Sequence, residues 1–258
     1  MTVEQWAQQV IEKQLNRSVF IHDDGSQPSM YDLRIGAVEA PDVAIECVGA
    51  VDSDFTETWT VGPGKGPLHL KVKGDWKIGI TWKTNIRRLE RRIEPVLQKL
   101  EKLDVSEVRV GLLLERDESG LLEDLESLDI LYVSCSRMPG TGRVHMIPEG
   151  VGGFVDSAGD ALPQWIEEFL CDPKQGDVLF KLRRTNAQER WVFVPVRFGG
   201  APWPVWSYLI GDLEYLPPTE PNLPSPVTGI WLASTLGTHG VRWDKAGWRS
   251  FRVIEDSK

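Results

Sequence analysis

The sequence predicts an α+β fold, in which a mixed α/β sheet flanked by helices is followed by a smaller β-rich part. Of its 258 residues, 41% are hydrophobic and 26% are charged, which is typical of a globular protein with a sizeable core. Apolar residues recur at helical spacing in some segments and alternate with polar ones in others. The composition shifts toward Gly, Pro and Trp after residue 137. We therefore expect a domain over 1–137 and a β-rich C-terminal domain or extension over 138–258.

The first 82 residues are expected to begin with a helix and continue as strands. An apolar stripe predicts the helix over 3–16, and a short strand follows at 18–21. Two alternating segments joined by a loop carrying Pro41 are typical of a hairpin over 30–48. A flexible loop at 62–66 precedes a further hairpin formed by 68–72 and 76–82.

A long helix is expected over 85–103, where Asn85 can provide the N-cap and Pro95 should kink or split the helix. Apolar runs then predict buried strands over 108–114 and 130–135, with a short helix within 115–126.

The remainder of the chain is expected to be mainly β. A Gly- and Pro-rich boundary over 139–153 leads to a short helix over 162–170, and a Pro-rich loop occupies 216–226. The expected strands of this part are 178–182, 191–196, 230–233, 241–243 and 248–253.

Composition excludes several classes of protein. The three cysteines and four histidines are scattered, which indicates neither a disulfide framework nor a zinc site. The N-terminus lacks an apolar signal-peptide core, and no apolar run is long enough to cross a bilayer. We therefore expect a cytoplasmic protein with no membrane partner. The net charge of −9 excludes a uniformly basic nucleic-acid binder.

Asp32 and Glu46 form the one combination that indicates a specific chemistry. Apolar and polar residues alternate along both strands of the hairpin over 30–48, so these two carboxylates fall on the same face, opposite the apolar residues. Residues that lie opposite or diagonal across two strands can share one divalent cation. Because two adjacent carboxylates repel each other, they favour a bound cation or a retained proton. The pair is therefore a candidate site for Mg²⁺ or Mn²⁺, which can activate water for phosphodiester attack.

The order of helix, strand, acid-bearing hairpin, basic helix and two buried strands resembles the PD-(D/E)XK nuclease superfamily, which has the restriction-endonuclease-like fold. The resemblance covers about residues 1–137. It implies that Asp32 and Glu46 are catalytic metal ligands and that Glu4 of the first helix is an accessory acid. It also implies a metal-dependent nuclease, with a role in bacterial restriction or antiviral defence by analogy of fold.

The chain departs from the family pattern at one position. The family's lysine falls two residues after the second acid, where this chain has Val48. Without it, no local group orients the attacking water or stabilises the developing charge. Lys71, Lys73 and Lys83 are candidates for a substitute amine, and Arg34 lies on the face of Asp32, but spacing selects none of them.

A second interpretation stays open. Both acids can be solvated residues on the outer face of the hairpin, with Arg34 as a salt-bridge partner. A rival function is a catalytically inactive binding or scaffold protein on a degenerate nuclease fold, with a Trp-rich C-terminal surface for a protein partner. A third possibility is that the hairpin acids have no role and the whole chain is a partner-binding subunit.

A locally basic segment could contact nucleic acid. Residues 65–109 contain 12 basic and 6 acidic side chains, within a chain whose net charge is −9. Phosphates could bind the polar side of the long helix and the loop before it. The candidate phosphate-binding residues are Lys83, Arg87, Arg88, Arg91 and Arg92. The alternative is a solvated face with Glu–Arg pairs at helical spacing.

The chain contains 11 tryptophans, an unusual number beside 4 tyrosines. Trp59, Trp76 and Trp82 lie near the basic segment, where a Trp could stack on an unpaired base or pack in the core. The tryptophans of the C-terminal part could likewise fill a compact β layer or form a recognition surface.

Overall fold

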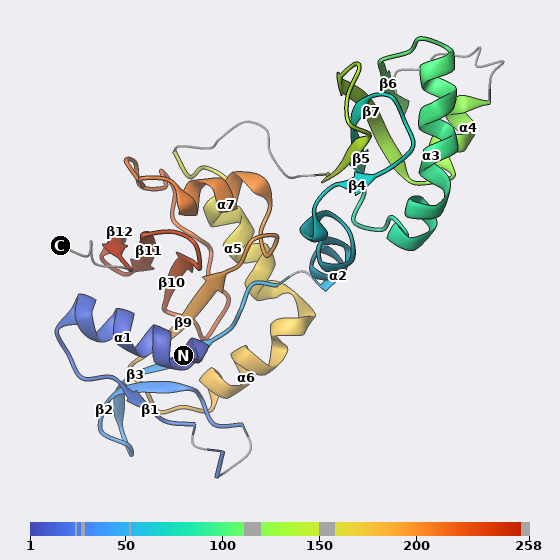
Figure 1. Cartoon of the computed structure of the whole chain (residues 1–258). Coiled ribbons are helices and arrows are strands. Elements are labelled where there is room, and N and C mark those ends of the chain that lie inside the picture. The colour runs from blue at the N-terminus through green and yellow to red at the C-terminus, as the bar shows by residue number, and fades with distance from the viewer. Residues whose placement is uncertain (24, 27–28, 52, 111–119, 150–157, 254–258) are drawn as a thin grey trace. The chain divides into compact units, whose positions relative to one another are not determined.

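The structure, a computed structural model, describes residues 1–23, 25–26, 29–51, 53–110, 120–149 and 158–253 and confirms the α+β class. The chain forms two compact units. Unit 1 combines Met1–Val51 with Gly152–Lys258, and unit 2 is Asp52–Val151 (Figure 1). This division differs from the expected domains at 1–137 and 138–258, because the strands before and after unit 2 belong to one sheet.

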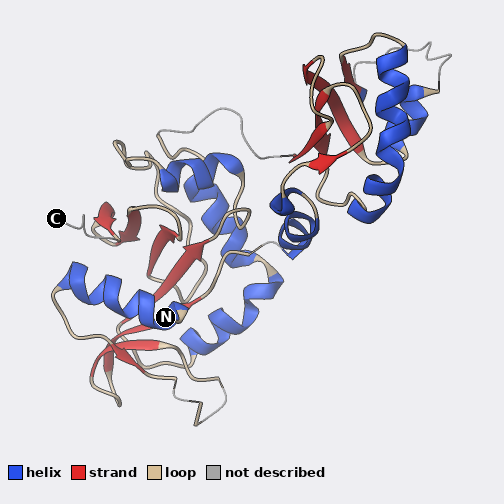
Figure 2. Cartoon of the chain, in the orientation of Figure 1, coloured by secondary structure: helices blue, strands red, loops and turns tan. Residues whose placement is uncertain are grey.

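Unit 1 is a mixed sheet with helices on both faces (Figure 2). In order across the sheet, its strands are β1 (Phe20–Ile21), β2 (Leu33–Gly36), β3 (Pro41–Cys47), β9 (Glu189–Val196), β10 (Gly229–Ser234), β11 (His239–Asp244) and β12 (Gly247–Arg252). Its helices are α1 (Val3–Leu15), α5 (Leu162–Cys171), α6 (Gly176–Arg183) and α7 (Trp203–Ile210). Strands β3, β9 and β10 run parallel, and the other neighbouring pairs are antiparallel.

Two apolar clusters cover the two faces of this sheet. On one face, Ala7 and Ile11 of α1 pack with Leu33 and Ile45. On the other, residues of α5, α6 and α7 pack with Ala44 of β3 and with alternate residues of β9 and β10. The central strands are therefore buried on both faces, unlike the half-solvated hairpin that the sequence suggested.

Helix α1 begins where its sequence predicts. Thr2 provides the N-cap, and its hydroxyl accepts a hydrogen bond from the backbone N–H of Gln5. The side chain of Gln5 accepts in return from the N–H of Thr2, which completes a capping box. The expected helix over 3–16 is confirmed.

The segment predicted as a strand over 178–182 is instead helix α6. Val178 and Leu182 are both buried and lie four residues apart, which is helical spacing. Asp177 and Lys181 form an ion pair at the same spacing. The apolar run is short enough to fit either period, and packing of one helical face against the sheet decides the outcome.

Unit 2 has its own five-stranded sheet. Across that sheet the strands are β4 (Leu68–His69), β8 (Arg143–Pro148), β5 (Asp75–Ile80), β7 (Ile130–Arg137) and β6 (Glu107–Arg109). Its helices are α2 (Ser53–Val61), the 3-10 turn η1 (Pro63–Lys65), α3 (Ile86–Lys102) and α4 (Leu121–Glu126). The unit has a separate apolar core, in which α3 and α4 pack with alternate residues of β5 and with Ile130 and Val133 of β7.

Several expectations for unit 2 are wrong. Strands β4 and β5 do not form a hairpin, because β8 lies between them and pairs with both. Strand β8 and helix α2 were not predicted; β8 lies in the Gly- and Pro-rich stretch that was interpreted as a boundary. The strand expected over 108–114 is described only as β6, an edge strand whose Glu107 and Arg109 are exposed, and 111–114 lie outside the described residues.

Helix α3 confirms the long helix predicted over 85–103. The side-chain oxygen of Asn85 accepts a hydrogen bond from the backbone N–H of Arg88, which caps the first turn. The helix continues through Pro95 and is not split there. Its apolar stripe is buried, as the periodicity predicts, and comprises Ile86, Leu89, Ile93, Val96, Leu97 and Leu100.

The C-terminal strands expected at 191–196, 230–233, 241–243 and 248–253 correspond to β9 to β12. Helix α7, with Trp203 and Trp206, was missed. Among the described residues, no helix combines the length and the apolar character that a membrane span requires.

Candidate functional site

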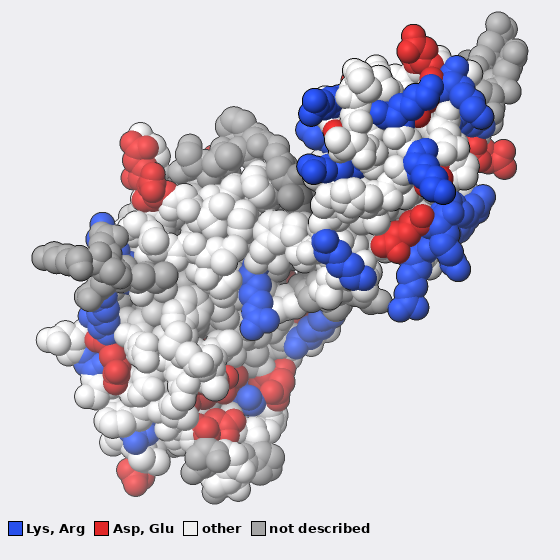
Figure 3. All heavy atoms as spheres, viewed as in Figure 1, with Lys and Arg blue, Asp and Glu red and all other residues white. Residues whose placement is uncertain are grey.

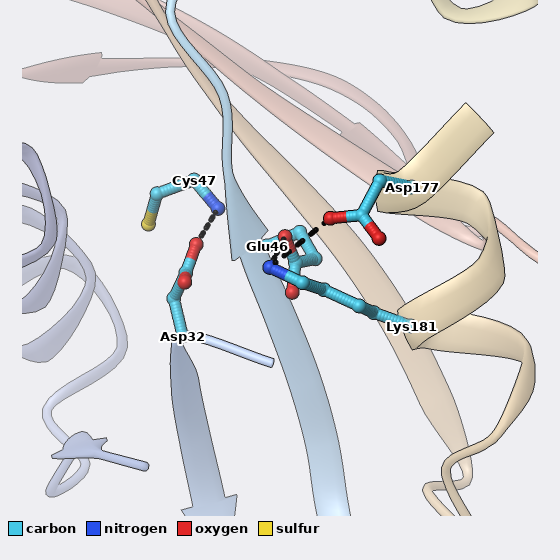
Figure 4. Close-up of polar contacts among 5 residues, drawn as sticks. All are labelled: Asp32, Glu46, Cys47, Asp177 and Lys181. Carbon is cyan, nitrogen blue, oxygen red and sulfur yellow. Dashed lines mark hydrogen bonds and ion pairs between the residues drawn. The ribbon is translucent and has the colours of Figure 1, made fainter. Parts of the chain in front are cut away.

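Asp32 directly precedes β2 and Glu46 lies in β3, so the two acids are neighbours across the hairpin, as the sequence predicts. The register of β2 and β3 pairs Leu33 with Ile45, so one further step places Asp32 opposite Glu46. Asp32 Oδ2 accepts a hydrogen bond of 2.6 Å from the backbone N–H of Cys47 (Figure 4). The hairpin register thus fixes both acids at the end of β3.

The carboxylate of Glu46 is buried, and one of its oxygens has no partner. The residue is only 2% exposed, and among the described residues no donor reaches Oε1. This contradicts the alternative in which both acids are solvated. Arg34 does not pair with either acid: its Nη1 donates to the carbonyl of Gly36, and its guanidinium lies 4.5 Å from the ring centre of Phe20.

An amine reaches the acid pair from a distant part of the chain. Lys181 extends from α6 and places its Nζ 3.5 Å from Oε2 of Glu46 (Figure 4). The same Nζ lies 3.5 Å from Oδ2 of Asp177, one helical turn earlier on α6. The side chain of Lys181 is 17% exposed and that of Asp177 is 69% exposed, so the ammonium lies between a buried and a solvated carboxylate.

Burial makes ionisation of the acid pair costly. Burial, with repulsion from Asp32 as the next cause, raises the pKa of Glu46 to about 8, although Lys181 opposes the shift. Burial also raises the pKa of Asp32, against the hydrogen bond from Cys47 and the charge of Lys181. Near neutral pH Glu46 therefore keeps a proton even with Lys181 in place, and a cation bound there would have to displace it.

Lys181 keeps its proton in this setting. Burial lowers the pKa of an amine, but the carboxylates of Glu46, Asp32 and Asp177 outweigh that effect and raise the pKa of Lys181 above its usual value. The amine is thus a positively charged hydrogen-bond donor beside the acid pair, not a general base.

Glu4 lies near the same site. Its charge contributes to the raised pKa of Asp32. Burial, followed by the charges of Asp32, Glu4 and Glu46, raises the pKa of the Cys47 thiol well above its usual value. The first turn of α1 therefore adds a third carboxylate to the electrostatic environment of the pair.

The other predicted site residues belong to unit 2. The backbone N–H groups of Lys71 and Lys73 donate to the carboxylates of Glu94 and Glu101 on α3. The predicted phosphate-binding residues are exposed on α3 and in the loop before it: Lys83, Arg87, Arg88, Arg91 and Arg92. The acid pair belongs instead to unit 1, and the amine that contacts Glu46 there is that of Lys181.

The donor set fits a hard divalent cation with few protein ligands. Carboxylate oxygens suit Mg²⁺ and Mn²⁺, and Mg²⁺ commonly uses one or two carboxylates together with water and substrate phosphate. The buried Oε1 of Glu46 has no hydrogen-bond donor among the described residues, and the charge of Asp32 acts on the same carboxyl group. This oxygen is therefore available to a cation. Within the described ranges, no group of three or more His, Cys, Asp and Glu side chains is placed to hold a metal ion. Asp32 and Glu46 are the two residues that would hold the cation.

Sequence reasoning missed Lys181, which lies 135 residues from Glu46. The available signal was the pairing of Asp177 with Lys181 and of Val178 with Leu182 at helical spacing, which places Lys181 on a helix. It does not reveal which strand that helix covers.

Comparisons of the chain with protein-family models, with curated proteins and with solved structures found no match.

Proposed function

We propose that unit 1 is a metal-dependent phosphodiester hydrolase that acts on nucleic acid, with Asp32 and Glu46 as metal ligands and Lys181 as the catalytic amine. The observation that carries the proposal is the contact between Lys181 and Glu46. It supplies, from α6, the amine that the resemblance to PD-(D/E)XK nucleases requires and that Val48 cannot provide.

The arrangement of elements supports the same proposal. The helix, strand and acid-bearing hairpin are α1, β1, β2 and β3. After unit 2, the chain runs through α5 and α6 into β9, which pairs parallel with β3 and extends the same sheet. We therefore assign the nuclease-like part to 1–51 and 152–258, in place of the span 1–137 that sequence order suggested.

Each residue of the site has a separate role in the proposed reaction. A divalent cation held by Asp32 and Glu46 would supply a Lewis acid and lower the pKa of a bound water. Lys181, which stays charged, would stabilise the negative charge that develops on the phosphate oxygens. Glu4 adds negative potential that favours cation binding. Asp177 holds the Lys181 ammonium from the solvent side.

A second candidate function follows from the same contact. Lys181 already neutralises part of the acid pair, so the three residues can form a structural ion pair in an inactive binding or scaffold protein. In that case no divalent cation binds, and the Glu46–Lys181 pair contributes only to the packing of α6 on β3.

Cleavage of nucleic acid tests the proposal. Single- and double-stranded DNA and RNA are incubated with Mg²⁺ or Mn²⁺ and with wild type, Asp32→Asn or Glu46→Gln. Each variant should lose at least about 100-fold in rate, because the loss of a metal ligand removes the Lewis acid. Calorimetric titration with Mn²⁺ provides a readout without substrate: wild type binds the ion, and Glu46→Gln does not.

Glu39→Gln is the matched control, because it removes one exposed carboxylate from the turn between β2 and β3. It should cleave and bind Mn²⁺ like wild type. The proposal is wrong if wild type cleaves none of the four substrates, and a failure to bind Mn²⁺ as well would favour the structural ion pair.

A further inference from the structure

Helix α3 carries a concentrated positive surface on unit 2. Four arginines, Arg87, Arg88, Arg91 and Arg92, are exposed on its N-terminal half, and we call them the arginine ridge. Their positions alternate with the buried stripe that includes Leu89 and Ile93, so the ridge faces away from the core of unit 2. Figure 3 shows Lys and Arg side chains gathered over the part of unit 2 where α3 lies.

The positive charge of the ridge is not neutralised by salt bridges. Among the residues that the structure describes, none of the four arginines forms an ion pair. The nearby Glu94 is engaged elsewhere, since its carboxylate accepts from the backbone of Lys71 and from Gln98. The alternative of Glu–Arg pairs along this helix is therefore not found.

The position of the ridge on the helix is itself unfavourable. The N-terminus of a helix carries a partial positive charge and favours acidic side chains, yet the first turn of α3 has no acid and carries Arg87 and Arg88. Arg87 with Arg91, and Arg88 with Arg92, are like-charge pairs one turn apart, which also destabilise a helix. An anion bound along the ridge would relieve both effects.

An aromatic cluster precedes the ridge in the chain. Trp82 stands directly before Lys83 in the segment that leads into α3, and its ring lies 4.0 Å from that of Phe55, centre to centre. Phe55 stacks in turn on Trp59 at 6.0 Å. Trp82 keeps part of its surface exposed, whereas Trp76 is fully buried in the core. A half-buried indole that directly precedes a row of cations in the chain could stack on an unpaired base whose phosphates contact those cations.

We infer that unit 2 is a nucleic-acid-binding insertion, in which the arginine ridge contacts the phosphates of a single strand and Trp82 stacks on one of its bases. The arginines can contact phosphates because, among the described residues, none of them forms an ion pair with an acidic side chain. The partly exposed Trp82 accounts for the choice of a single strand, whose bases are free to stack.

Binding of labelled oligonucleotides to the full chain tests this inference. Fluorescence anisotropy is measured with single-stranded and duplex DNA in EDTA, between about 50 and 200 mM salt. Arg88→Ala/Arg91→Ala should weaken binding by about 10-fold or more and reduce the salt slope by about 1.4, since each single-strand phosphate contact contributes about 0.7. Trp82→Ala should weaken single-strand binding by about 10-fold and leave duplex binding unchanged.

A charge-matched control separates the ridge from the total charge. Lys174→Ala/Lys245→Ala removes two exposed cations of unit 1 and should bind like wild type. Arg88→Lys/Arg91→Lys keeps the charge and should retain most of the salt slope. The inference is overturned if the ridge variant binds like wild type, if the control loses as much affinity, or if Trp82→Ala leaves single-strand binding unchanged.

This inference stands apart from the hydrolase proposal. EDTA removes the divalent cation, so binding is measured without cleavage. If the ridge binds nucleic acid and no substrate is cut, the hydrolase proposal fails and the binding surface remains. If cleavage is normal in the ridge variant and binding is unchanged, only the ridge inference fails.

Discussion

At the scale of single residues, the sequence identified the acids of the candidate site but not the amine. Strand alternation places Asp32 and Glu46 on one face with only local information, because a strand has a period of two residues. Lys181 reaches Glu46 across 135 residues, through the packing of α6 on β3. No local pattern contains that contact, and the lysines chosen as substitutes, Lys71 and Lys73, belong to unit 2.

The buried Glu46 predicts an unusual dependence of stability on pH. Its pKa is about 8 in the folded chain and 4.5 in the reference state, so between these values the folded chain holds a proton that the unfolded chain has lost. Stability therefore falls as pH rises through this range, by a few kcal/mol, and it falls no further above pH 8.

Glu46→Gln should remove this dependence. In urea unfolding followed from about pH 5 to about pH 8, the variant should gain stability relative to wild type as pH rises. Glu39→Gln serves as the exposed comparison and should follow wild type. Parallel curves for Glu46→Gln and wild type would show that Glu46 ionises normally.

Asp177 is predicted to be a positioning residue for Lys181. Asp177→Asn should lower the pKa of the Lys181 amine, because one of the carboxylates that raise it is lost. The shift should be modest, since the Asp177 side chain is 69% exposed and solvent screens it.

NMR titration of the Lys181 Cε signal measures this shift, and Asp177→Glu should restore the wild-type value. The cleavage rate of Asp177→Asn should fall less than that of a Lys181 variant. If the titration curve of Lys181 is unchanged in Asp177→Asn, Asp177 does not act as a positioning residue for Lys181.

At the scale of elements, the sequence predicts long helices more accurately than short ones. Helix α3 repeats its apolar stripe over 17 residues, so its period is clear and its boundaries were predicted closely. Helix α6 has 8 residues and too few turns to distinguish helix from strand, and α7 with 8 residues was missed for the same reason. The error at α6 concealed the site, because Lys181 was assigned to a strand.

The arginine ridge predicts a trade-off between stability and binding. Arg87→Glu/Arg88→Glu places acids in the first turn of α3, where the helix dipole favours them. This variant should be more stable than wild type by about 0.5–2 kcal/mol in urea unfolding and should lose nucleic-acid binding.

Arg87→Gln/Arg88→Gln removes the charges without adding acids, so it should show an intermediate gain in stability. If the Glu variant is destabilised while its α3 remains folded, the first-turn arginines are not under electrostatic strain.

At the scale of the whole molecule, the chain is two units with separate cores, one inserted into the other. Sequence order alone suggested a division near residue 137, because an insertion leaves no distinct signal when both units alternate helices and strands. The pairing of β3 with β9 is what reveals it. The local excess of positive charge falls within unit 2, so the charge pattern follows the division.

Separate cores predict separate effects of core substitutions. Leu89 is fully buried in the core of unit 2, and Leu89→Ala should destabilise that unit by about 2–5 kcal/mol. Hydrogen exchange should show lost protection in α3 and β5, with protection in β9 and β10 retained. Equal loss of protection in both units would mean that the chain unfolds as one cooperative body.

The most direct test of the account asks whether the Lys181 amine can be moved. Val48 directly follows β3 and packs in the same apolar cluster as Ala44, so a lysine at 48 would extend from the end of β3 on the face that α6 covers. Single-turnover cleavage is compared for wild type, Lys181→Ala and Lys181→Ala/Val48→Lys. The account predicts a loss of about 100-fold or more in Lys181→Ala and substantial recovery in the double variant. Cleavage by Lys181→Ala at the wild-type rate would contradict it.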